Sequence, residues 1–569
     1  MKKRNILWAA ALLGLVACSN DDELQNSGAE QDSPVTVIAT LPGNDTRVTL
    51  QDVTDENGKN IIKVDWRESG ECFTAMTTSA VGYENQEDYR FHQTSGDEFQ
   101  GVLPEKIDGQ PYYAYYPAIN LWNTESDCYK YWDNEGNELS AFSATCVPFD
   151  FYDQNGMLDE NNTLMMATST DGGNFAFRHL TAIVKFTLSG FPANVQEAYF
   201  QMSWDGGCPT NGCFDLTQAD IASMYPESED GFIQIATPIT DKTATFYAYL
   251  PPVAKGKTLE IICGYNDEEY AHICSTSVEL AEKGIDAGKF YRVARTMEVE
   301  SQSRQMTAGS VEELQAWVDA FQKFGGGINL TLTGDIDLTE ADLDGDSENE
   351  SNWPWLDLYG GVTINGNGHT LKGVKRVVED ESASLFGSID ESSVVQHLHL
   401  NDVNFSSSGY YASGVVSDNF GRVVGCSVSG TIECGNAGYP CGGIVGFNNS
   451  SGRVIACYST ASVTGGYCCG SIAGENHNVG EDVGQSGIKA CYYTSGDYGI
   501  GCDGLSGDAC DNGAENVDGN SITWESVIDN MNQLLTEYAS DSYKYQLNDD
   551  EATKGDMPLK LIEKPEYEW

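Results

Sequence analysis

Histidine pairs and acidic runs are the first places to look for chemistry in this chain. His397 and His399 alternate in "QHLHL", and alternating residues of a strand share one face, which is a geometry that can bind a metal. No carboxylate partner is identifiable for them, so a solvated or stacked pair is the favoured interpretation. The chain lacks HExxH, GxSxG and P-loop motifs. The sequence therefore predicts no catalytic residue and no cofactor.

The second candidate is the acidic segment Asp342–Glu350, "DLDGDSENE", which has the alternating acids of a calcium loop. However, Ser347 stands where an EF-hand has its glycine, and Trp353 stands where it has its last glutamate. A solvated acidic loop is the default interpretation, with calcium binding as the alternative. Cys208 and Cys213 in "CPTNGC" are the best local candidates for a disulfide. No paired CxxC motif of the zinc type is present, and we expect no metal centre.

Composition limits the partners. The 569 residues include 86 acidic and 31 basic side chains, so the net charge is −55. Such a chain repels nucleic acid and anionic lipid headgroups, and we expect no nucleic-acid partner. Aromatic residues make up 11% of the chain, with 29 tyrosines, which favours packed β-structure over disorder. The length predicts two or three domains.

The amino terminus predicts export. Basic residues precede an apolar run from Ile6 to Val16, followed by small residues up to Cys18. Leu15–Cys18 resembles a bacterial lipobox, which implies a signal peptide over 1–18 and outer-membrane anchoring through lipid on Cys18. The acidic residues that follow, Ser19–Glu23, are similar to the surface-export tag of Bacteroidota-type lipoproteins. An ordinary signal peptide and a plain acidic linker are the alternatives. Residues 19–33 read as an acidic tether.

Residues 34–299 alternate short β-branched or aromatic runs with turn residues, which predicts an antiparallel β-sandwich region. "DTRVTL", "FRHLTAIVKFTLSG", "TFYAYLPP…KTLEIICGY" and "AGKFYRV" resemble the fimbrillin-like family of surface lipoproteins. That resemblance implies strand exchange with other fimbrial subunits after an arginine-specific cleavage, for which Arg47 is the candidate. A plain surface arginine is the favoured interpretation of Arg47.

After a linker at 300–309, the pattern changes. Ser310 and Glu313 form a capping-box pattern ahead of an apolar stripe, which predicts a helix ended by glycines from Gly325. A second amphipathic run, "TWESVIDNMNQLLTEY", predicts another helix near the carboxyl end. We expect the two helices to cover the two open ends of whatever lies between them.

Between these helices lies an internal repeat of about 28–30 residues. Val415, Ile444 and Ile472 correspond in three copies, and so do the cysteines at 426, 457 and 491. Its "GGIVG…I.AC…G.VTGG" pattern resembles the GLUG motif of bacterial surface proteins. Short strands without helices predict a parallel β-helix over 310–569, with the equivalent cysteines stacked as a buried apolar ladder.

The predicted function is adhesion. The chain would be a cell-surface lipoprotein, either an accessory or tip component of a fimbria-like fibre or a stand-alone adhesin, whose β-helix binds a host or neighbouring-cell ligand such as a glycan. The clearest repeat copies carry mostly Ser, Thr, Asn, Gly and Tyr, which favours binding over turnover. A glycan-degrading β-helix enzyme and a structural spacer are the alternatives.

Overall fold

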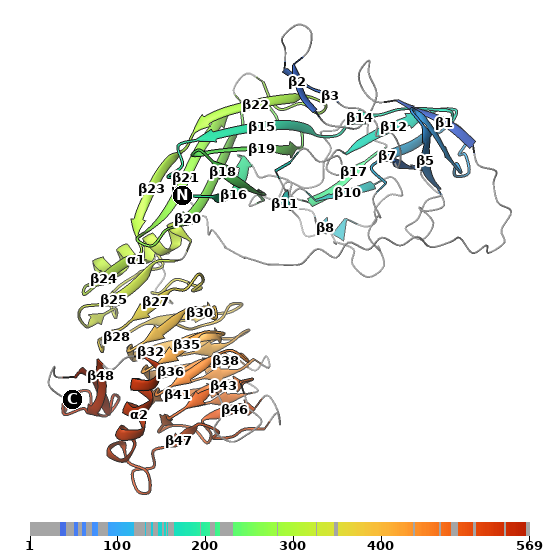
Figure 1. Ribbon diagram of the computed structural model, residues 1–569. Helices are drawn as coiled ribbons and strands as arrows, with labels where there is room; N and C mark the ends of the chain where they lie inside the picture. The colour runs from blue at the N-terminus through green and yellow to red at the C-terminus, as the bar shows by residue number, and fades with distance from the viewer. Residues whose placement is uncertain are drawn as a thin grey trace. The chain divides into compact units, whose positions relative to one another are not determined.

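The computed structural model describes residues 35–40, 51–54, 60–63, 71–77, 89–118, 131–132, 138–139, 146–150, 153–154, 156–157, 164–193, 195–204, 211–216, 231–280, 283–325, 327–345, 351–435, 439–465, 468–478, 487–503, 508–539 and 542–564. These residues are mostly β-strand, with two α-helices, which confirms the predicted all-β class (Figure 1). They divide into two compact units, residues 35–265 with 272–300, and residues 266–271 with 301–564.

The first unit contains two large sheets. An 8-stranded sheet has the order β13 (Asn174–Ala176), β1 (Val35–Thr40), β6 (Glu98–Gly101), β5 (Arg90–Ser95), β4 (Cys72–Met76), β7 (Tyr112–Tyr116), β12 (Met165–Ser169), β14 (Arg178–His179). Its core is aromatic, because the Phe73 ring lies 5.1–5.4 Å from four other phenylalanine rings. Such clusters stabilise a sheet through offset and edge-to-face ring contacts.

A 9-stranded sheet follows, with the order β22 (Phe290–Thr296), β15 (Ala182–Ser189), β19 (Thr243–Leu250), β18 (Ile233–Thr240), β16 (Glu197–Trp204), β20 (Thr258–Asn266), β21 (Tyr270–Glu279), β23 (Glu298–Ser303), while β11 (Asp153–Gln154) also pairs with β18. Burial alternates along β18, as one buried face requires. Most pairs are antiparallel, but β15–β22, β1–β13 and β11–β18 are parallel. The expectation of a purely antiparallel region is wrong in these pairs, because strands distant in sequence return beside earlier ones.

Three two-stranded ribbons complete this unit among the described residues. They are β2 (Gln51–Thr54) with β3 (Asn60–Lys63), β8 (Tyr131–Trp132) with β9 (Glu138–Leu139), and β10 (Cys146–Asp150) with β17 (Asn211–Asp215).

The second unit begins at β24 (Gln305–Ala308) and helix α1 (Val311–Phe324). Ser310 caps the helix by accepting from the Glu313 N–H, and Gly325 ends it in the left-handed conformation, as predicted. The predicted capping box differs in one bond, because the Glu313 carboxylate accepts from the Gly309 N–H at 2.7 Å. The apolar stripe is buried against the first strands of the unit, where the Trp317 Nε1–H donates to the Ile328 carbonyl.

The repeat copies pair with one another in parallel and in register, and they lie one above the next (Figure 1). Two of the sheets are formed by one strand from each copy. They are β30 (Phe386–Ile389), β34 (Val416–Asn419), β38 (Val445–Asn448), β43 (Ala473–Asn476), β46 (Ile500–Asp503), and β33 (Ala412–Ser413), β37 (Cys441–Gly442), β42 (Cys469–Gly470).

Two further parallel sheets bound the same stack. One runs through β24, β25 (Asn329–Leu332), β27 (Thr363–Asn365), β31 (Val394–Gln396), β35 (Arg422–Val424), β39 (Arg453–Ile455), β44 (Ile488–Lys489). The other runs through β26 (Ile336–Asp337), β28 (Thr370–Lys372), β32 (His399–Ser407), β36 (Ser427–Cys434), β40 (Tyr458–Ser459), β45 (Cys491–Tyr493), β47 (Ala514–Asn516), with β29 (Lys375–Val378) beside β32 and β41 (Ser462–Gly465) beside β36.

Equivalent residues of successive copies stack inside this unit. Cys426, Cys457 and Cys491 are free thiols that are fully buried in one core, which confirms the predicted cysteine ladder. A polar ladder runs parallel to it, in which the Asn419 Nδ2 donates to Asn448 Oδ1 at 2.7 Å. The Asn448 Nδ2 in turn donates to Asn476 Oδ1 at 2.8 Å. These bonds satisfy amides that would otherwise be costly to bury.

The second helix, α2 (Trp524–Tyr538), begins at a capping box formed by Thr523 and Ser526. Its buried residues pack with Val424 and Ile455 of consecutive copies and with the hairpin β48 (Tyr543–Leu547)–β49 (Leu559–Glu563). The helix therefore runs along the side of the stack (Figure 1). The expectation that it covers the open end of the last copy is wrong, because its apolar stripe contacts the corners of several copies.

Candidate functional site

Several residues predicted from sequence lie outside the described part of the chain: Cys18, Arg47 and Cys208. Cys213 lies on β17, opposite Pro148 of β10. Of the acidic segment Asp342–Glu350, residues 346–350 are outside the described residues, and the Asp342 carboxylate accepts from the Gly345 N–H at 2.8 Å. Lipidation, cleavage, the disulfide and calcium binding therefore stay predictions.

The two histidines do not alternate on one strand. β31 ends at Gln396 and β32 begins at His399, because His397 has φ +53° and turns the chain between them. Both side chains are buried, and burial lowers the pKa of each to about 4. His399 Nδ1 lies 2.6 Å from Ser427 Oγ, while the His397 ring packs on Tyr543 with centroids 4.6 Å apart. The interpretation of the two histidines as a solvated pair, or as a metal-binding pair on one face, is therefore wrong. His397 stacks instead on an aromatic ring of the carboxyl-terminal hairpin.

A different set of side chains gathers on the outer face of the sheet β30–β34–β38–β43. Ser388, Asp418, Phe447 and Glu475 are register partners on these four strands. In each of the last three copies the next residue is a fully buried asparagine of the ladder, so the residue before it faces outward. We call this column, together with the side chains that contact it, the aromatic–acidic face.

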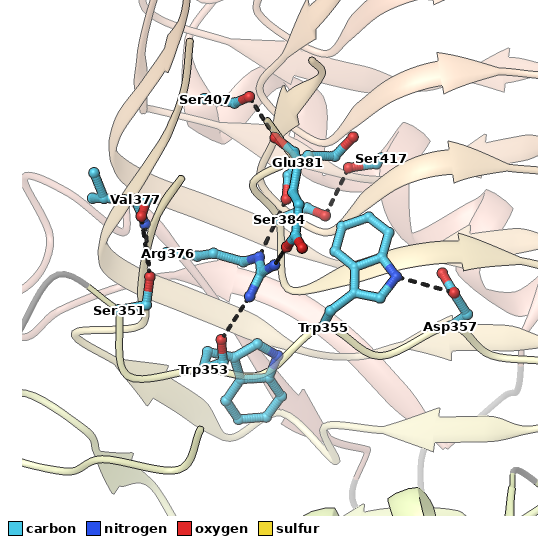
Figure 2. Close-up of polar contacts among 11 residues, drawn as sticks. Ser351, Trp353, Trp355, Asp357, Arg376, Val377, Glu381, Ser384, Ser407 and Ser417 are labelled. Atoms are coloured by element: carbon cyan, nitrogen blue, oxygen red, sulfur yellow. Dashed lines mark hydrogen bonds and ion pairs between the residues drawn. The ribbon is translucent and has the colours of Figure 1, made fainter. Parts of the chain in front are cut away.

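The first end of the face is built around Trp355 and Asp357 (Figure 2). The Trp355 Nε1–H donates to Asp357 Oδ2 at 3.0 Å, and Asp357 Oδ1 accepts from the Ser388 N–H at 2.7 Å. The indole also lies against Gly387, where an added Cβ would come within 2.1 Å of the ring. Only glycine leaves room there, so the indole can approach the strand backbone closely.

Arg376 also contacts this indole. Its guanidinium lies 5.3 Å from the Trp355 ring centroid, a cation–π distance. It also donates to the carbonyls of Trp353 and Ser382 and pairs with the Glu381 carboxylate (Figure 2). The arginine is buried and each of its three nitrogens has a hydrogen-bond partner, so its charge orients Trp355 and is not offered to solvent.

Asp418 lies at the middle of the face. It accepts from the Asn449 side-chain amide, while burial raises the pKa of its carboxyl to about 6. Burial also raises the pKa of Asp357, with hydrogen bonds from Ser388 and Trp355 opposing it. The phenol of Tyr359 bonds to Ser388 and lies in the field of both carboxylates, and burial raises its pKa. Two carboxyl groups whose pKa values are both raised by burial thus share one surface.

Aromatic rings continue along the remaining copies. The charges of Asp418 and Glu475 contribute, after burial, to a raised pKa of Tyr411. The ring of Tyr411 packs edge-on against that of Tyr439, with centroids 5.4 Å apart. Phe447 packs on the ring of His477 with centroids 4.6 Å apart. His477 Nε2 in turn lies 2.5 Å from Glu475 Oε1. Rings and carboxylates therefore alternate over the strands from β30 to β43.

This arrangement suits recognition of a polyhydroxylated chain. Aromatic faces pack on the apolar C–H face of a sugar ring, and carboxylates accept hydrogen bonds from its hydroxyl groups. Acids of the face outnumber its one saturated arginine, so it repels anionic polymers. Among the described residues no cluster of three His, Cys, Asp or Glu side chains could hold a metal ion.

The face was missed from sequence because its acids come from separate copies. The copies carry mostly Ser, Thr, Asn, Gly and Tyr, but Asp418 and Glu475 of two copies share one surface with Asp357. The available signal was the column just before the repeated asparagine, in "SDN", "GFN" and "GEN". Strand alternation places that column outside once the asparagine is placed inside.

In the described part of the chain, no helix is both long enough and apolar enough to span a bilayer.

No protein-family model and no curated protein matches the chain. Several solved structures align with about half of it. A candidate cell adhesion protein from Bacteroides ovatus aligns over 48% of this chain and 96% of its own, with 13% identity and a TM-score of 0.30. Another from Bacteroides uniformis covers 48% and 98%, with 14% identity and a TM-score of 0.25. A fimbrial assembly protein from Parabacteroides distasonis covers 48% and 96%, with 16% identity and a TM-score of 0.22. Similarity of this degree assigns neither fold nor function.

Proposed function

We propose that this protein is a cell-surface lipoprotein adhesin of the outer membrane, anchored through lipid on Cys18, that binds a glycan of a host or neighbouring cell. The stacked copies would form a parallel β-helix, and the aromatic–acidic face would be its binding surface. The observation that carries the proposal is the alternation of rings and carboxylates along one sheet, from Trp355 to Glu475. We further propose that it acts as an accessory or tip component of a fimbria-like fibre.

The charge of the face selects the class of glycan. Asp418 and Glu475 would accept hydrogen bonds from sugar hydroxyls or pair with an ammonium group, but they would repel uronate and sulfate groups. The net charge of −55 adds to that repulsion at long range. Neutral hexose polymers and amino-sugar polymers are therefore the proposed ligands.

Binding of the purified chain to immobilised neutral, amino-sugar and uronate polysaccharides tests this proposal. Trp355→Ala and Tyr411→Ala should each weaken binding to the preferred neutral or amino-sugar polymer by about tenfold, which corresponds to about 1.4 kcal/mol. Tyr199→Ala, at a comparably exposed tyrosine on β16 in the other unit, is the matched control. Preference for the uronate polymer, or equal binding by all three variants and the wild type, would contradict the proposal.

The anchor and the fibre have their own tests. Labelling with radioactive palmitate should mark the wild-type chain and spare Cys18→Ser. Unboiled surface extracts should contain a high-mass form that collapses to a monomer on boiling if the chain joins a fibre. Cells that express the protein without residues 310–569 should lose adhesion. Retained adhesion would contradict the assignment of the binding surface to the stacked copies.

A second candidate function is glycan hydrolysis, because the aromatic–acidic face carries a carboxyl group with a pKa of about 6 near another carboxylate. A proton held near neutral pH is what a general acid requires. We favour binding without turnover. Release of reducing ends that is lost in Asp418→Asn would reverse that preference, whereas unchanged binding without any release supports it.

A further inference from the structure

A second group of cysteines lies at another corner of the stack, where sheet β33–β37–β42 meets β36 and β41. Cys441 and Cys469 are register partners on β37 and β42. Cys434, at the end of β36, is paired with Gly465 of β41. All three cysteines are free thiols, and Cys469 is partly exposed while the other two are buried.

The sulfur atoms of Cys441 and Cys469 converge on one short stretch of backbone. The Cys441 thiol donates to the Thr464 carbonyl at 3.5 Å, and the Cys469 thiol donates to the next carbonyl, that of Gly465. The Cys434 thiol donates to the Pro440 carbonyl at 3.5 Å, directly before Cys441. The thiols of Cys441 and Cys469 therefore point at neighbouring atoms across adjacent strands.

A cross-copy disulfide already lies beside this group. Cys468, the residue before Cys469, is bonded to Cys502 of the following copy, with Cα atoms 5.3 Å apart. Adjacent parallel strands lie about 4.8 Å apart, which is within the Cα separation that a disulfide tolerates. The Cys441–Cys469 pair meets the same condition, one copy earlier in the stack.

We propose that Cys441 and Cys469 form a site of reversible oxidation that closes a second cross-copy disulfide. The oxidant is a small-molecule or protein disulfide of the cell exterior, so the inference rests on the proposed surface location. The partly exposed Cys469 thiolate attacks the oxidant, forming a mixed disulfide and releasing one thiol. Cys441 then attacks the Cys469 sulfur, and the second oxidant thiol leaves. Two thiols of the protein are oxidised, and one external disulfide is reduced to two thiols.

The local environment supports these roles. A hydrogen bond from Cys441 lowers the pKa of Cys469, with burial opposing it, while hydrogen bonds to Cys434 and Cys469 raise the pKa of Cys441. The accessible thiol is thus the better thiolate, and the buried one resolves the intermediate. With the existing bond, the new one would join three successive copies covalently.

Oxidation of the purified full-length chain with glutathione disulfide tests this inference independently of glycan binding. After denaturation and alkylation, peptide mapping by mass spectrometry should find a Cys441–Cys469 linkage. The ladder thiols, Cys426, Cys457 and Cys491, are fully buried and are the internal control, so they should remain alkylated.

Two variants assign the roles. Cys441→Ser should leave Cys469 as a stable mixed disulfide with glutathione, and Cys434→Ser should leave the linkage intact. The proposal would be overturned if the oxidised chain showed the Cys468–Cys502 disulfide but still carried an alkylated Cys469. A disulfide between Cys434 and Cys441 would overturn it as well. The wild-type map decides the question even if a variant fails to fold.

Discussion

Asn448 lies at the centre of the buried amide ladder and uses both ends of its side chain. It accepts from Asn419 and donates to Asn476 and to the Gly452 carbonyl. An amide with paired neighbours in the copies on both sides can be removed only by taking a hydrogen-bond partner from each of them.

Asn448→Ala should therefore lower the free energy of unfolding by about 3 kcal/mol, because two buried amide groups lose a partner. Denaturant unfolding measures the change. Asn404→Ala, at an exposed asparagine of β32, should change stability by less than about 0.5 kcal/mol. If Asn448→Ala lowered the free energy of unfolding as little as Asn404→Ala does, water would have replaced the lost hydrogen bonds.

Asp418 gives a second prediction at the residue scale, from its pKa of about 6. The folded state holds the proton more tightly than the unfolded chain, so stability present below pH 4 is lost as the pH rises from about 4 to about 6. Asp418→Asn should remove this dependence and stabilise the protein at pH 7 by up to about 1 kcal/mol, after allowance for solvent screening.

Unfolding free energies at pH 4.5 and pH 7 measure this difference. Asp529→Asn, at an exposed acid of α2, is the control that should leave the pH dependence unchanged. An Asp418→Asn variant with the wild-type dependence would show that its carboxyl ionises normally.

At the scale of elements, helix α2 and the hairpin β48–β49 cover the corner that holds His397 and His399. The groups around the imidazoles are Ser427, Tyr458 and Tyr543, with His369 and Asp335 exerting charge effects on His399. Asp335 raises the pKa of His399, but burial outweighs it. Protonation is therefore resisted by the packing of this cover.

Acid should destabilise the packing of α2 and the hairpin β48–β49 against the corner that holds the two histidines. Both histidines have a folded pKa of about 4, below the ordinary value of 6.5, so the unfolded state binds more protons between these values. Stability is full above pH 6.5 and falls toward pH 4, by up to roughly 3 kcal/mol for each histidine. His397→Asn, which tolerates the left-handed backbone, should reduce the pH dependence of hydrogen exchange in α2, and exposed His92→Asn should not. Equal acid sensitivity in both variants would contradict the role of burial.

The same elements show how far sequence reasoning reaches. Leu314, Trp317, Val318 and Phe321 recur at helical spacing, so the buried stripe of α1 was predictable from local pattern alone. The stripe of α2 predicted that the helix is buried but not what it packs against, because Val424 and Ile455 are brought to it by the stacking of copies. The aromatic–acidic face was hidden for the same reason, since Asp357 and Asp418 meet only after two copies pair.

On the scale of the whole molecule, the two units have separate hydrophobic cores. Phe73 and Phe186 lie in cores of the first unit, and the cysteine ladder lies in the core of the second. Compact units that do not share a core generally unfold as separate cooperative units.

Calorimetry should therefore resolve two transitions. Asn448→Ala should lower the midpoint of one of them, and Phe73→Leu should lower the midpoint of the other through a core cavity. If either substitution moves both transitions together, the cores are energetically coupled.

Pairing in register has a last consequence for how such a protein can change in length. Val416, Val445, Ala473 and Ile500 succeed one another at intervals of 29, 28 and 27 residues, each on the next parallel strand. Duplicating one interval in the gene would insert a complete layer, with its asparagine and its outward column, and would leave every other pairing unchanged. The length of the stack, and of the proposed binding surface on it, can thus evolve in steps of about 4.8 Å without redesign of the core.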